Sequence, residues 1–553
     1  LQKATKISKE EISQLIEIPP DPKLGDFAFP TFTLAKKLKT SPQKIAISLS
    51  KKIKLTREIE KIQPIGSYLN FFVNTKELAK TTLKKIQKEK DNYGSQKIKS
   101  KVLIESPGPN TNKPLHIGHA RNIILAQSIQ KILEFIGNTT KIVNINNDRG
   151  THICKSLVSY EKFGKNITPE KANRKSDFLV GDYYVRYSKE LKQNPLLENE
   201  VKDCLQKWEA GDKKTHTLWK KMNNWALKGF KETYKKFDLK IDKEYYESKI
   251  YKKGRDIILE QFKKGNVIKK DKAYTIDLGN KWGEKVLLRS DGTSIYITQD
   301  LFLAKVRKKD FNFDKMIYVV ANEQNYHFEV LFELLRLFGY SWANSLEHLN
   351  YGLVHLESGR MKSREGTIVD TDELIADIEE LAIKELKVRY PNLSKNEIKE
   401  RAKPIAMAAL RYYFLKIERS KDMIFKPRES INFEGNTGPY LLYTYARARS
   451  ILRKAKYNPK KQYKLNKITE QEKSILSMLN TFPSITGNAY KNLSPNLIAN
   501  YAYQLAQKFN GYYHSEKVIN SKNEQFKLSI VNSFSQVLKN ALSLLGIRTL
   551  EKM

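Results

Sequence analysis

The chain of 553 residues contains only two cysteines, Cys154 and Cys204, and they are too far apart for a CxxC motif. This scarcity excludes a disulfide scaffold and argues against a cysteine-based zinc site. No apolar run reaches the roughly 18–20 residues of a membrane span. The first residues, LQKATKISKEEISQL, lack the apolar core of a secretory signal. We therefore expect a cytoplasmic protein that does not enter a membrane and has no metal centre.

Acidic residues are few relative to basic ones, since 61 Asp and Glu face 100 Lys and Arg, for a formal net charge of +39. A positive field of this size attracts polyanions, so nucleic acid is the first partner to consider. The surplus is mostly lysine spread along the whole chain, and a compositional bias of the source explains it equally well. The charge alone therefore assigns no function.

Two stretches of the chain alternate strand and helix. KVLIES (101–106) and KIVNIN (141–146) are short apolar strands with a helical pattern between them. KMIYVVAN (315–322), a helix over 325–338 and HLNYGLVHL (348–356) repeat this order. Strand–helix–strand order predicts a parallel sheet with crossover helices. A chain of this length also exceeds what one hydrophobic core usually serves.

The remaining segments predict further domains. Within residues 1–93, GDFAFPTFTLAKKLKTSPQKIA predicts a loop and two helices, the second starting near Ser41-Pro42, and IGSYLNFFV alternates like a strand. The pattern from 371 onward is helical nearly throughout. We therefore expect an α/β multidomain protein with an N-terminal α+β domain (1–93), a sheet domain (94–160 and 286–370) interrupted by an insertion (161–285), a helical region (371–430) and a helical bundle (431–553).

The motif PGPNTNKPLHIGHAR (107–121) follows the first predicted strand and opens a helix. Free N–H groups at a helix start form an anion site suited to phosphate. Gly118 has no side chain, so a flat ring such as adenine can approach the backbone. His116 and His119 share one face of the first turn and can donate hydrogen bonds to phosphoryl oxygens during an in-line displacement. Pro114 fixes the helix entry, and Lys113 can reach the same phosphates.

Blander interpretations of this motif exist. The two histidines could be a surface pair or half of a metal site, and Lys113 alone could be a solvated loop residue. A metal site needs carboxylate or cysteine partners at ligand spacing, and none occurs nearby in the sequence. The position between a strand and a long helix favours the phosphate interpretation.

The sequence HIGH at a strand-to-helix turn resembles the first signature of the class I aminoacyl-tRNA synthetases. Nucleotidyltransferases share HxGH but are usually much shorter. The second synthetase signature is the loop KMSKS after the last strand, and GRMKSREGTIVD follows HLNYGLVHL here. Met361 matches the methionine of that loop, Arg360 stands at its first lysine and Ser363 at its second.

A loop without its second lysine is typical of the arginyl enzymes, in which a lysine just before HIGH is thought to supply the missing charge. Lys113 occupies that position. The resemblance thus implies catalytic roles for His116, His119 and Lys113. It implies ATP contacts from His116, Gly118, His119, Lys113, His327, Arg360, Met361, Lys362 and Ser363.

A site for arginine needs buried carboxylates and polar acceptors, because a guanidinium is planar, always charged and rich in donors. Such a site rejects analogues that leave its polar groups unpaired. Candidates lie where strand ends converge in an α/β fold, and they match the arginyl pattern. The resemblance implies arginine contacts from Glu105, Asn110, Tyr296, Asp300 and Gln324, with Asp300 at the guanidinium. Taken singly, Glu105 could be a surface charge, Asp300 a helix cap and Gln324 a loop residue.

The C-terminal segment NTGPYLLYTYARARSIL resembles the anticodon-binding bundle of the arginyl family. Aromatic side chains can stack on unpaired bases and arginine can bind phosphate or base edges. The N-terminal region resembles the added domain that meets the outer corner of the tRNA. The candidate tRNA contacts are Tyr68, Asn70, Tyr440, Tyr443, Arg447, Phe509, Tyr513 and Met553. The alternative is that these side chains belong to their own domain cores.

The resemblance extends from GDFAFP to the final Met553. It implies an arginyl-tRNA synthetase with a Rossmann-like catalytic domain, which forms arginyl-adenylate from ATP and arginine and esterifies the 3′-terminal adenosine of its tRNA, first at the 2′-OH. ATP with Mg²⁺ would be the co-substrate, with no zinc or organic cofactor, and the enzyme would be a monomer. The alternatives are a nucleotidyltransferase that shares HxGH and a non-catalytic RNA-binding protein built on a decayed synthetase.

Overall fold

The computed structural model describes residues 1–356 and 369–553. Four residues predicted to contact ATP, Arg360, Met361, Lys362 and Ser363, lie outside the described residues. None of the helices in the described part of the chain combines the length and apolarity that a bilayer span requires. Two compact units are described in turn, the first comprising residues 1–93, 447–483 and 504–540, and the second residues 94–446, 484–503 and 541–553.

The N-terminal part of the first unit contains a three-stranded antiparallel sheet of order β1-β3-β2, made of β1 (Phe27–Pro30), β2 (Ile59–Ile65) and β3 (Tyr68–Val73). The FAFP segment, predicted as a loop, is therefore a strand. Its pairing partner lies some forty residues later, with Phe27 opposite Phe71, and no local pattern announces so distant a partner. IGSYLNFFV contains the predicted strand, β3, which follows a turn from β2 at Gly66, where the backbone is left-handed.

Both helices that the sequence predicts in this part of the chain are present. The second predicted helix, α4 (Pro42–Lys52), starts at the expected residue because the Ser41 side chain accepts a hydrogen bond from the N–H of Lys44. The other helices are α1 (Gln2–Thr5), α2 (Lys9–Leu15), α3 (Phe32–Leu38) and α5 (Thr75–Glu89).

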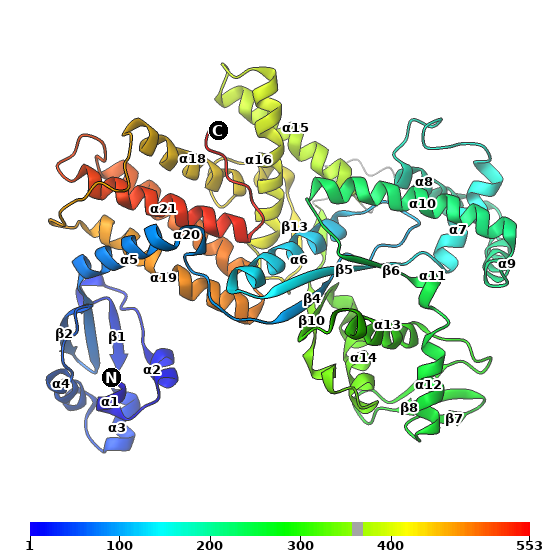
Figure 1. The fold of residues 1–553 in the computed structure, drawn as a ribbon, viewed down its shortest axis with the longest axis horizontal. Helices are drawn as coiled ribbons and strands as arrows, with labels where there is room; N and C mark the ends of the chain where they lie inside the picture. The colour runs from blue at the N-terminus through cyan, green and yellow to red at the C-terminus, as the bar shows by residue number, and fades with distance from the viewer. Residues whose placement is uncertain (357–368) are drawn as a thin grey trace. The chain divides into compact units, whose positions relative to one another are not determined.

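The second unit is built on the predicted parallel sheet. Its strand order is β11-β10-β4-β5-β6, and every neighbouring pair is parallel (Figure 1). The strands are β4 (Lys101–Glu105), β5 (Thr139–Asn146), β6 (Lys243–Tyr246), β10 (Lys315–Ala321) and β11 (Leu346–Tyr351).

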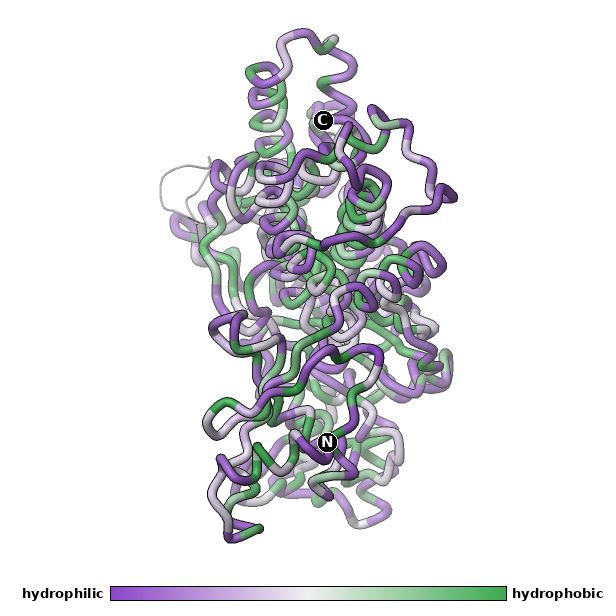
Figure 2. Tube along the Cα trace, turned by 90° about the vertical axis from the view of Figure 1, so that its left-hand side faces the viewer, coloured by the Kyte–Doolittle hydropathy of each residue, from purple (hydrophilic) through white to green (hydrophobic). Residues whose placement is uncertain are grey.

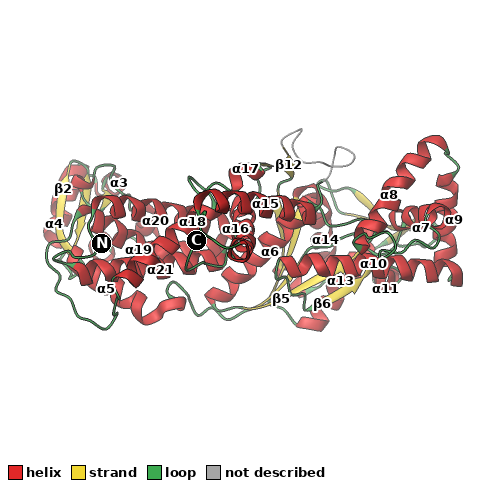
Figure 3. Cartoon of the chain, turned by 90° about the horizontal axis from the view of Figure 1, so that it is seen from above, coloured by secondary structure: helices red, strands yellow, loops and turns green. Residues whose placement is uncertain are grey.

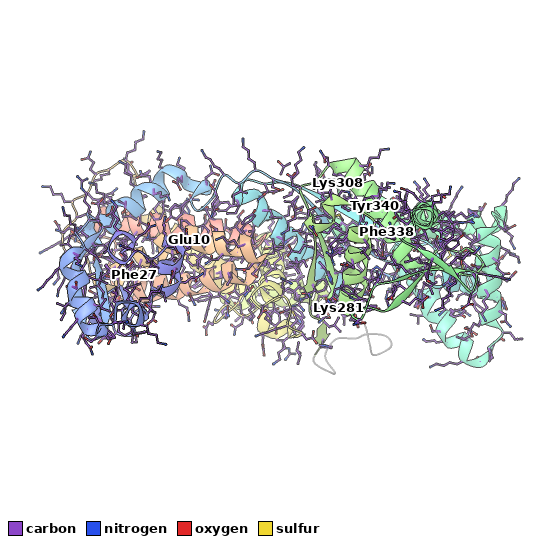
Figure 4. All side chains as sticks on the ribbon, turned by 90° about the horizontal axis from the view of Figure 1, so that it is seen from below. Glu10, Phe27, Lys281, Lys308, Phe338 and Tyr340 are labelled. Carbon is purple, nitrogen blue, oxygen red and sulfur yellow. The ribbon has the colours of Figure 1, made fainter. Side chains whose placement is uncertain are left out.

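Crossover helices join these strands, and each helix packs its apolar face on the sheet. Helix α6 (Ile117–Ile136) connects β4 to β5 and ends at Gly137, whose φ of 110° allows the chain to turn back. Helix α14 (Asn325–Leu337) connects β10 to β11. Phe338 and Tyr340, labelled in Figure 4, belong to the same cluster as the buried Leu331. Each fully buried side chain of this size contributes about 1.5–3 kcal/mol to folding.

The predicted strand HLNYGLVHL is two strands in the structure. The first strand ends just before Gly352. A Cβ added to this glycine would lie 2.4 Å from the carbonyl carbon of Lys421. After the break, β12 (Val354–Leu356) leaves the five-stranded sheet and pairs with β13 (Met423–Phe425). The departure places the end of β11 at the edge of the pocket described below.

The region expected as an insertion is mostly helical, but it contributes β6 to the central sheet. The predicted range 161–285 thus includes one strand of the domain it interrupts. Its elements, and those that border it, are α7 (Thr151–Phe163), α8 (Ser176–Gln193), α9 (Leu197–Glu209), α10 (Lys213–Lys236), α11 (Glu247–Ile250), α12 (Gly254–Lys263), β7 (Ile268–Lys270), β8 (Ala273–Asp277), β9 (Glu284–Leu288) and α13 (Tyr296–Phe311).

The chain after 371 is helical nearly throughout, as predicted, and appears as red helices in Figure 3. A reciprocal capping box between Ser394 and Glu397 starts one of these helices. Figure 2 shows hydrophilic segments along the whole tube, in line with the even spread of lysine. The helices are α15 (Thr371–Arg389), α16 (Lys395–Leu415), α17 (Pro427–Ser430), α18 (Gly438–Lys454), α19 (Glu470–Asn492), α20 (Pro495–Ser515) and α21 (Glu524–Leu544).

Candidate active site

A pocket of about 510 Å³ lies at the carboxyl ends of the parallel strands β4, β5, β10 and β11. Ligands bind at this edge in open α/β sheets, because the loops that follow the strands converge there. The pocket brings together most of the predicted substrate residues. They are Glu105, Asn110, His116, Gly118, His119, Asp300, Gln324 and His327.

The side chains of the two signature histidines each accept a backbone N–H at the start of helix α6. The N–H of Gly118 donates to Nδ1 of His116 at 3.1 Å, and the N–H of His116 donates to Nδ1 of His119 at 3.1 Å. Because both Nδ1 atoms accept, each neutral ring carries its proton on Nε2. Both Nε2–H groups remain available as donors at the helix start.

Both histidines are neutral at physiological pH. Burial, together with the charge of Lys113, lowers the pKa of His116 to about 4. Burial, with the charges of His116 and Lys113, holds the pKa of His119 well below its usual range. Their ring centroids are 4.0 Å apart. The arrangement is a pair of uncharged hydrogen-bond donors beside a positive helix end.

Gly118 has a structural role that the sequence did not suggest, and its predicted role at the nucleotide stays a prediction. A Cβ at this position would lie 3.0 Å from Cε1 and 3.1 Å from Nδ1 of His116. The glycine therefore makes room for the capping histidine ring. Any space that it leaves for a nucleotide comes in addition to this packing requirement.

Lys113 does not line the pocket, but it lies close enough to His116 and His119 for its charge to lower both pKa values. Burial lowers the pKa of Lys113 itself, and the carboxylate of Asp370 opposes this shift. Asp370 was not singled out in the sequence. Backbone bonds of its neighbours hold it there, since Ile117 N–H donates to Val369 O at 3.0 Å and Thr371 N–H to Leu115 O at 2.8 Å.

Asp300, on helix α13, is hydrogen-bonded to His327, on helix α14. Oδ2 of Asp300 lies 2.7 Å from Nε2 of His327. Burial by itself lowers the pKa of His327, but the hydrogen bond and charge of Asp300, with the charge of Glu105, outweigh it and raise the pKa. The sequence placed these two residues in adjacent subsites and did not anticipate their contact.

Glu105 ends β4, as predicted, and forms a buried ion pair with Arg307 of helix α13. Arg307 was not predicted from the sequence. A signal was present, since Arg307 follows Asp300 by seven residues, or two helical turns, on the same helix face. Burial raises the pKa of Glu105, and the Arg307 guanidinium opposes that shift.

The loop between β4 and α6 is fixed by side chains of neighbouring elements. The N–H of Gly108 donates to Oδ1 of Asn144 at 2.9 Å, and Asn110 forms a backbone bridge with Asn147.

Asn122, one turn into α6, accepts from Ser106 Oγ at 2.6 Å and donates to Val319 O at 2.6 Å. Asn122 also lines the pocket and was missed, because a lone polar residue inside an apolar helix carries no motif.

Tyr296 does not line the pocket in this structure. It is the first residue of α13 and its side chain is 72% exposed. It lies one helical turn before Asp300, on the same helix face as Asp300 and Arg307. Its predicted contact with arginine stays a prediction.

Two of the predicted tRNA contacts, Arg447 and Tyr513, form a cluster in the first unit. The guanidinium of Arg447 lies 5.0 Å from the ring centroid of Tyr513, and it donates to Oδ1 of Asn510 at 2.7 Å. The Tyr513 side chain is 41% exposed. Phe509 instead packs inside the bundle, fully buried and stacked on Phe534 with centroids 3.8 Å apart. The structure therefore gives Phe509 a core position.

The other predicted tRNA contacts also divide by burial. Asn70 is 3% exposed and lies within β3, and Met553 is buried with its carbonyl accepting from Arg401 at 2.6 Å. Tyr68, half-buried, packs edge-on against Phe32. Tyr440 packs edge-on against Tyr503, and both Tyr440 and Tyr443 are half-buried on α18.

Among residues 1–356 and 369–553, no group of three or more His, Cys, Asp or Glu side chains is placed to hold a metal ion. The pocket combines the start of α6, which carries two neutral histidines, with the carboxylates of Glu105, Asp300 and Glu323.

Three family models together match nearly the entire chain. They are described as the arginyl tRNA synthetase N terminal domain (residues 1–73), the class I (R) tRNA synthetase catalytic domain (82–426) and the DALR anticodon binding domain (441–553). The chain belongs to the arginyl-tRNA synthetases. The catalytic model alone spans the whole pocket, from Glu105 to Val354.

Curated relatives agree with this assignment to the arginyl-tRNA synthetases. The arginine–tRNA ligase of Treponema denticola is 44% identical over 99% of this chain and 96% of its own length. That of Borrelia duttonii is 41% identical over 100% and 96%. Among solved structures, the arginyl-tRNA synthetase of Thermus thermophilus is 27% identical, with a TM-score of 0.83 over 97% of this chain and 96% of that one.

Proposed function

We propose that the 510 Å³ pocket of this arginyl-tRNA synthetase is the site at which ATP and L-arginine form arginyl-adenylate. The arginine carboxylate attacks the α-phosphorus of ATP and pyrophosphate leaves. Arginine is then transferred to the 3′-terminal adenosine of an arginine tRNA, first to its 2′-OH. One observation supports this best: uncharged donors at a helix start line the same pocket as the carboxylates of Glu105 and Asp300.

The helix end and its histidines serve the phosphates in this proposal. Negative charge shifts between phosphoryl oxygens during in-line displacement, and preorganised donors stabilise it without reorganising. The Nε2–H groups of His116 and His119 supply such donors. Lys113, whose charge lowers the pKa of both histidines, supplies the positive charge. Mg²⁺ would enter with ATP.

The carboxylates serve the amino acid. Asp300 and Glu105 offer acceptors for a planar, charged guanidinium, and Gln324 and Asn110 offer polar groups for the rest of the substrate. An analogue without the guanidinium would leave acceptor positions on the buried Glu105 and the half-buried Asp300 unfilled, which costs about 1–3 kcal/mol for each buried group. The pocket therefore favours arginine over apolar amino acids.

The exposed and half-buried aromatic residues serve the tRNA. We assign base or backbone contacts to Tyr513, Arg447, Tyr440, Tyr443 and Tyr68, and core positions to Phe509, Asn70 and Met553. A cytoplasmic monomer remains our expectation for the enzyme in the cell.

Aminoacylation of tRNA measured with each of the twenty amino acids tests the proposal. Charging with arginine alone is expected. Absence of any charged product would favour the non-catalytic RNA-binding alternative. Pyrophosphate exchange that does not depend on arginine would favour a nucleotidyltransferase, although that alternative leaves the anticodon-binding match unexplained.

A further inference from the structure

The pocket that we propose for a substrate guanidinium already contains one guanidinium of the chain. Arg307 lines the pocket, and its side chain is 1% exposed. It forms an ion pair with Oε2 of Glu105. The Glu105 carboxylate, which is proposed to attract the substrate arginine, is thus already paired with an arginine of the chain.

Stability alone does not account for Arg307. A buried ion pair is expensive to desolvate, and apolar side chains of similar volume often replace such pairs with no loss. In the described part of the chain, neither Nε nor Nη2 of Arg307 has a hydrogen-bond partner with acceptable geometry. A buried guanidinium that is satisfied at so few of its donors calls for another explanation.

The surroundings hold Arg307 in one orientation. Its Cζ lies 5.2 Å from the ring centroid of Tyr245 and 5.7 Å from that of Tyr318. These distances allow cation–π attraction from both rings. The rings belong to β6 and β10, which pair with the strands β5 and β4 at the pocket floor. The guanidinium is therefore fixed by the central sheet.

Five groups face the Glu105 carboxylate from the elements around it. Arg307 and Asp300 come from α13, His327 from α14, Tyr318 from β10 and Tyr245 from β6. Arg307 is the permanent cation of this set. With Arg307 present and His327 neutral, Glu105, Asp300 and Arg307 sum to a single negative charge, which matches one substrate guanidinium. Glu323 also lines the pocket, but it is exposed and is not among the groups that act on Glu105.

We propose that Arg307 is a positioning residue, whose guanidinium orients one oxygen of Glu105 and gives the pocket the charge balance that one substrate guanidinium requires. This inference rests on the proposed arginine pocket. Arg307 acts through Glu105 and does not itself touch the substrate.

Removal of the internal cation has a defined consequence. Burial and the charge of Asp300 both raise the pKa of Glu105, and Arg307 is the main opposing influence. Without it, the pKa of Glu105 rises further, and a larger fraction of this carboxyl is protonated at a given pH and no longer attracts a cation. Arginine binding then weakens, and it recovers as the pH is raised and Glu105 ionises.

Steady-state aminoacylation by the full-length enzyme, measured from pH 6 to 9, tests the inference. In Arg307→Met we expect the KM for arginine to rise about tenfold or more at the acid end of this range and to fall as the pH is raised, by at most about tenfold for each pH unit. The KM for ATP should stay within about twofold, because the phosphate side of the pocket does not contact Arg307. Arg307→Lys keeps the charge and should restore most of the arginine affinity.

Two further variants separate the possible failures. Glu105→Gln should raise the KM for arginine equally at every pH, and adding Arg307→Met to it should cause little further loss. An unchanged KM in Glu105→Gln would overturn the arginine pocket itself. A raised KM in Glu105→Gln combined with an unchanged or pH-independent KM in Arg307→Met would overturn only the role of Arg307. Thermal unfolding and tRNA binding of each variant report whether the fold is kept.

Discussion

His119 accepts the backbone N–H of His116 at its Nδ1, and His116 accepts that of Gly118 in the same way, both at 3.1 Å, so the two histidines together cap the start of α6. The nitrogens that accept the capping bonds and the nitrogens proposed to donate to phosphate are thus opposite atoms of the same rings. Structure and chemistry at the start of α6 cannot be changed separately at these positions, and the first prediction follows from that.

His119→Ala should affect both stability and rate. Loss of the cap costs about 1 kcal/mol in the free energy of unfolding. Loss of a phosphate donor should slow pyrophosphate exchange about 100-fold. Chemical denaturation and exchange assays measure the two effects. His152→Ala, on the exposed face of α7, is the matched control, and an equal rate loss there would contradict the assignment.

Asp300→Asn should raise the KM for arginine about 30-fold to 100-fold, because a charged hydrogen bond worth about 2–3 kcal/mol is lost. ATP binding should hardly change, since Asp300 faces His327 and Glu105 and not the helix start. Steady-state kinetics with each substrate varied in turn make the comparison. Asp182→Asn, an exposed partner of Arg174, is the control. Equal losses for both substrates would rule out the proposed role.

Lys113→Ala should slow adenylate formation about 100-fold while tRNA binding stays within about threefold. The reason is that Lys113 contributes charge beside the histidines at the start of α6. Rapid-quench measurement of adenylate and a filter-binding assay with tRNA separate the two effects. Lys131→Ala, exposed on the same helix, should resemble the unmodified enzyme. A rate within a few-fold of normal for Lys113→Ala would refute the compensation.

Arginine binding should weaken in mild acid. The pKa of His327 is raised, so His327 takes up its proton at a higher pH than an ordinary histidine. Protonated His327 neutralises Asp300, and the KM for arginine should rise as the pH falls through that raised pKa. The same KM should level off at higher pH, where His327 is neutral. His327→Gln should flatten this part of the pH profile; an unaltered profile would show that another group is responsible.

Phe509 and Tyr513 should respond differently to substitution, although both belong to the predicted tRNA surface. Phe509→Ala should destabilise the protein by about 3–5 kcal/mol, because it removes a stacked core ring. Tyr513→Ala should leave stability nearly unchanged and weaken tRNA binding about tenfold, as loss of one stacking base does. Calorimetry and tRNA titration distinguish them, and the opposite pattern would restore Phe509 as the base contact.

The strands and helices around the pocket were predictable because each satisfies a local rule. KVLIES and KIVNIN are short apolar runs, and Gly137 ends the helix between them, so β4, α6 and β5 follow from patterning. FAFP escaped prediction because a four-residue strand depends on a distant partner. The break at Gly352 escaped because it depends on the approach of Lys421.

The sequence alone determined the family and the parallel sheet, and it predicted residues for the two substrate subsites, because these follow from local pattern and from motifs of fixed spacing. Only the tertiary structure decided which of those residues meet. The contact of Asp300 with His327, the ion pair of Glu105 with Arg307 and the burial of Phe509 join residues from separate elements. Such contacts depend on how helices pack against the sheet, and that packing is a property of the whole chain.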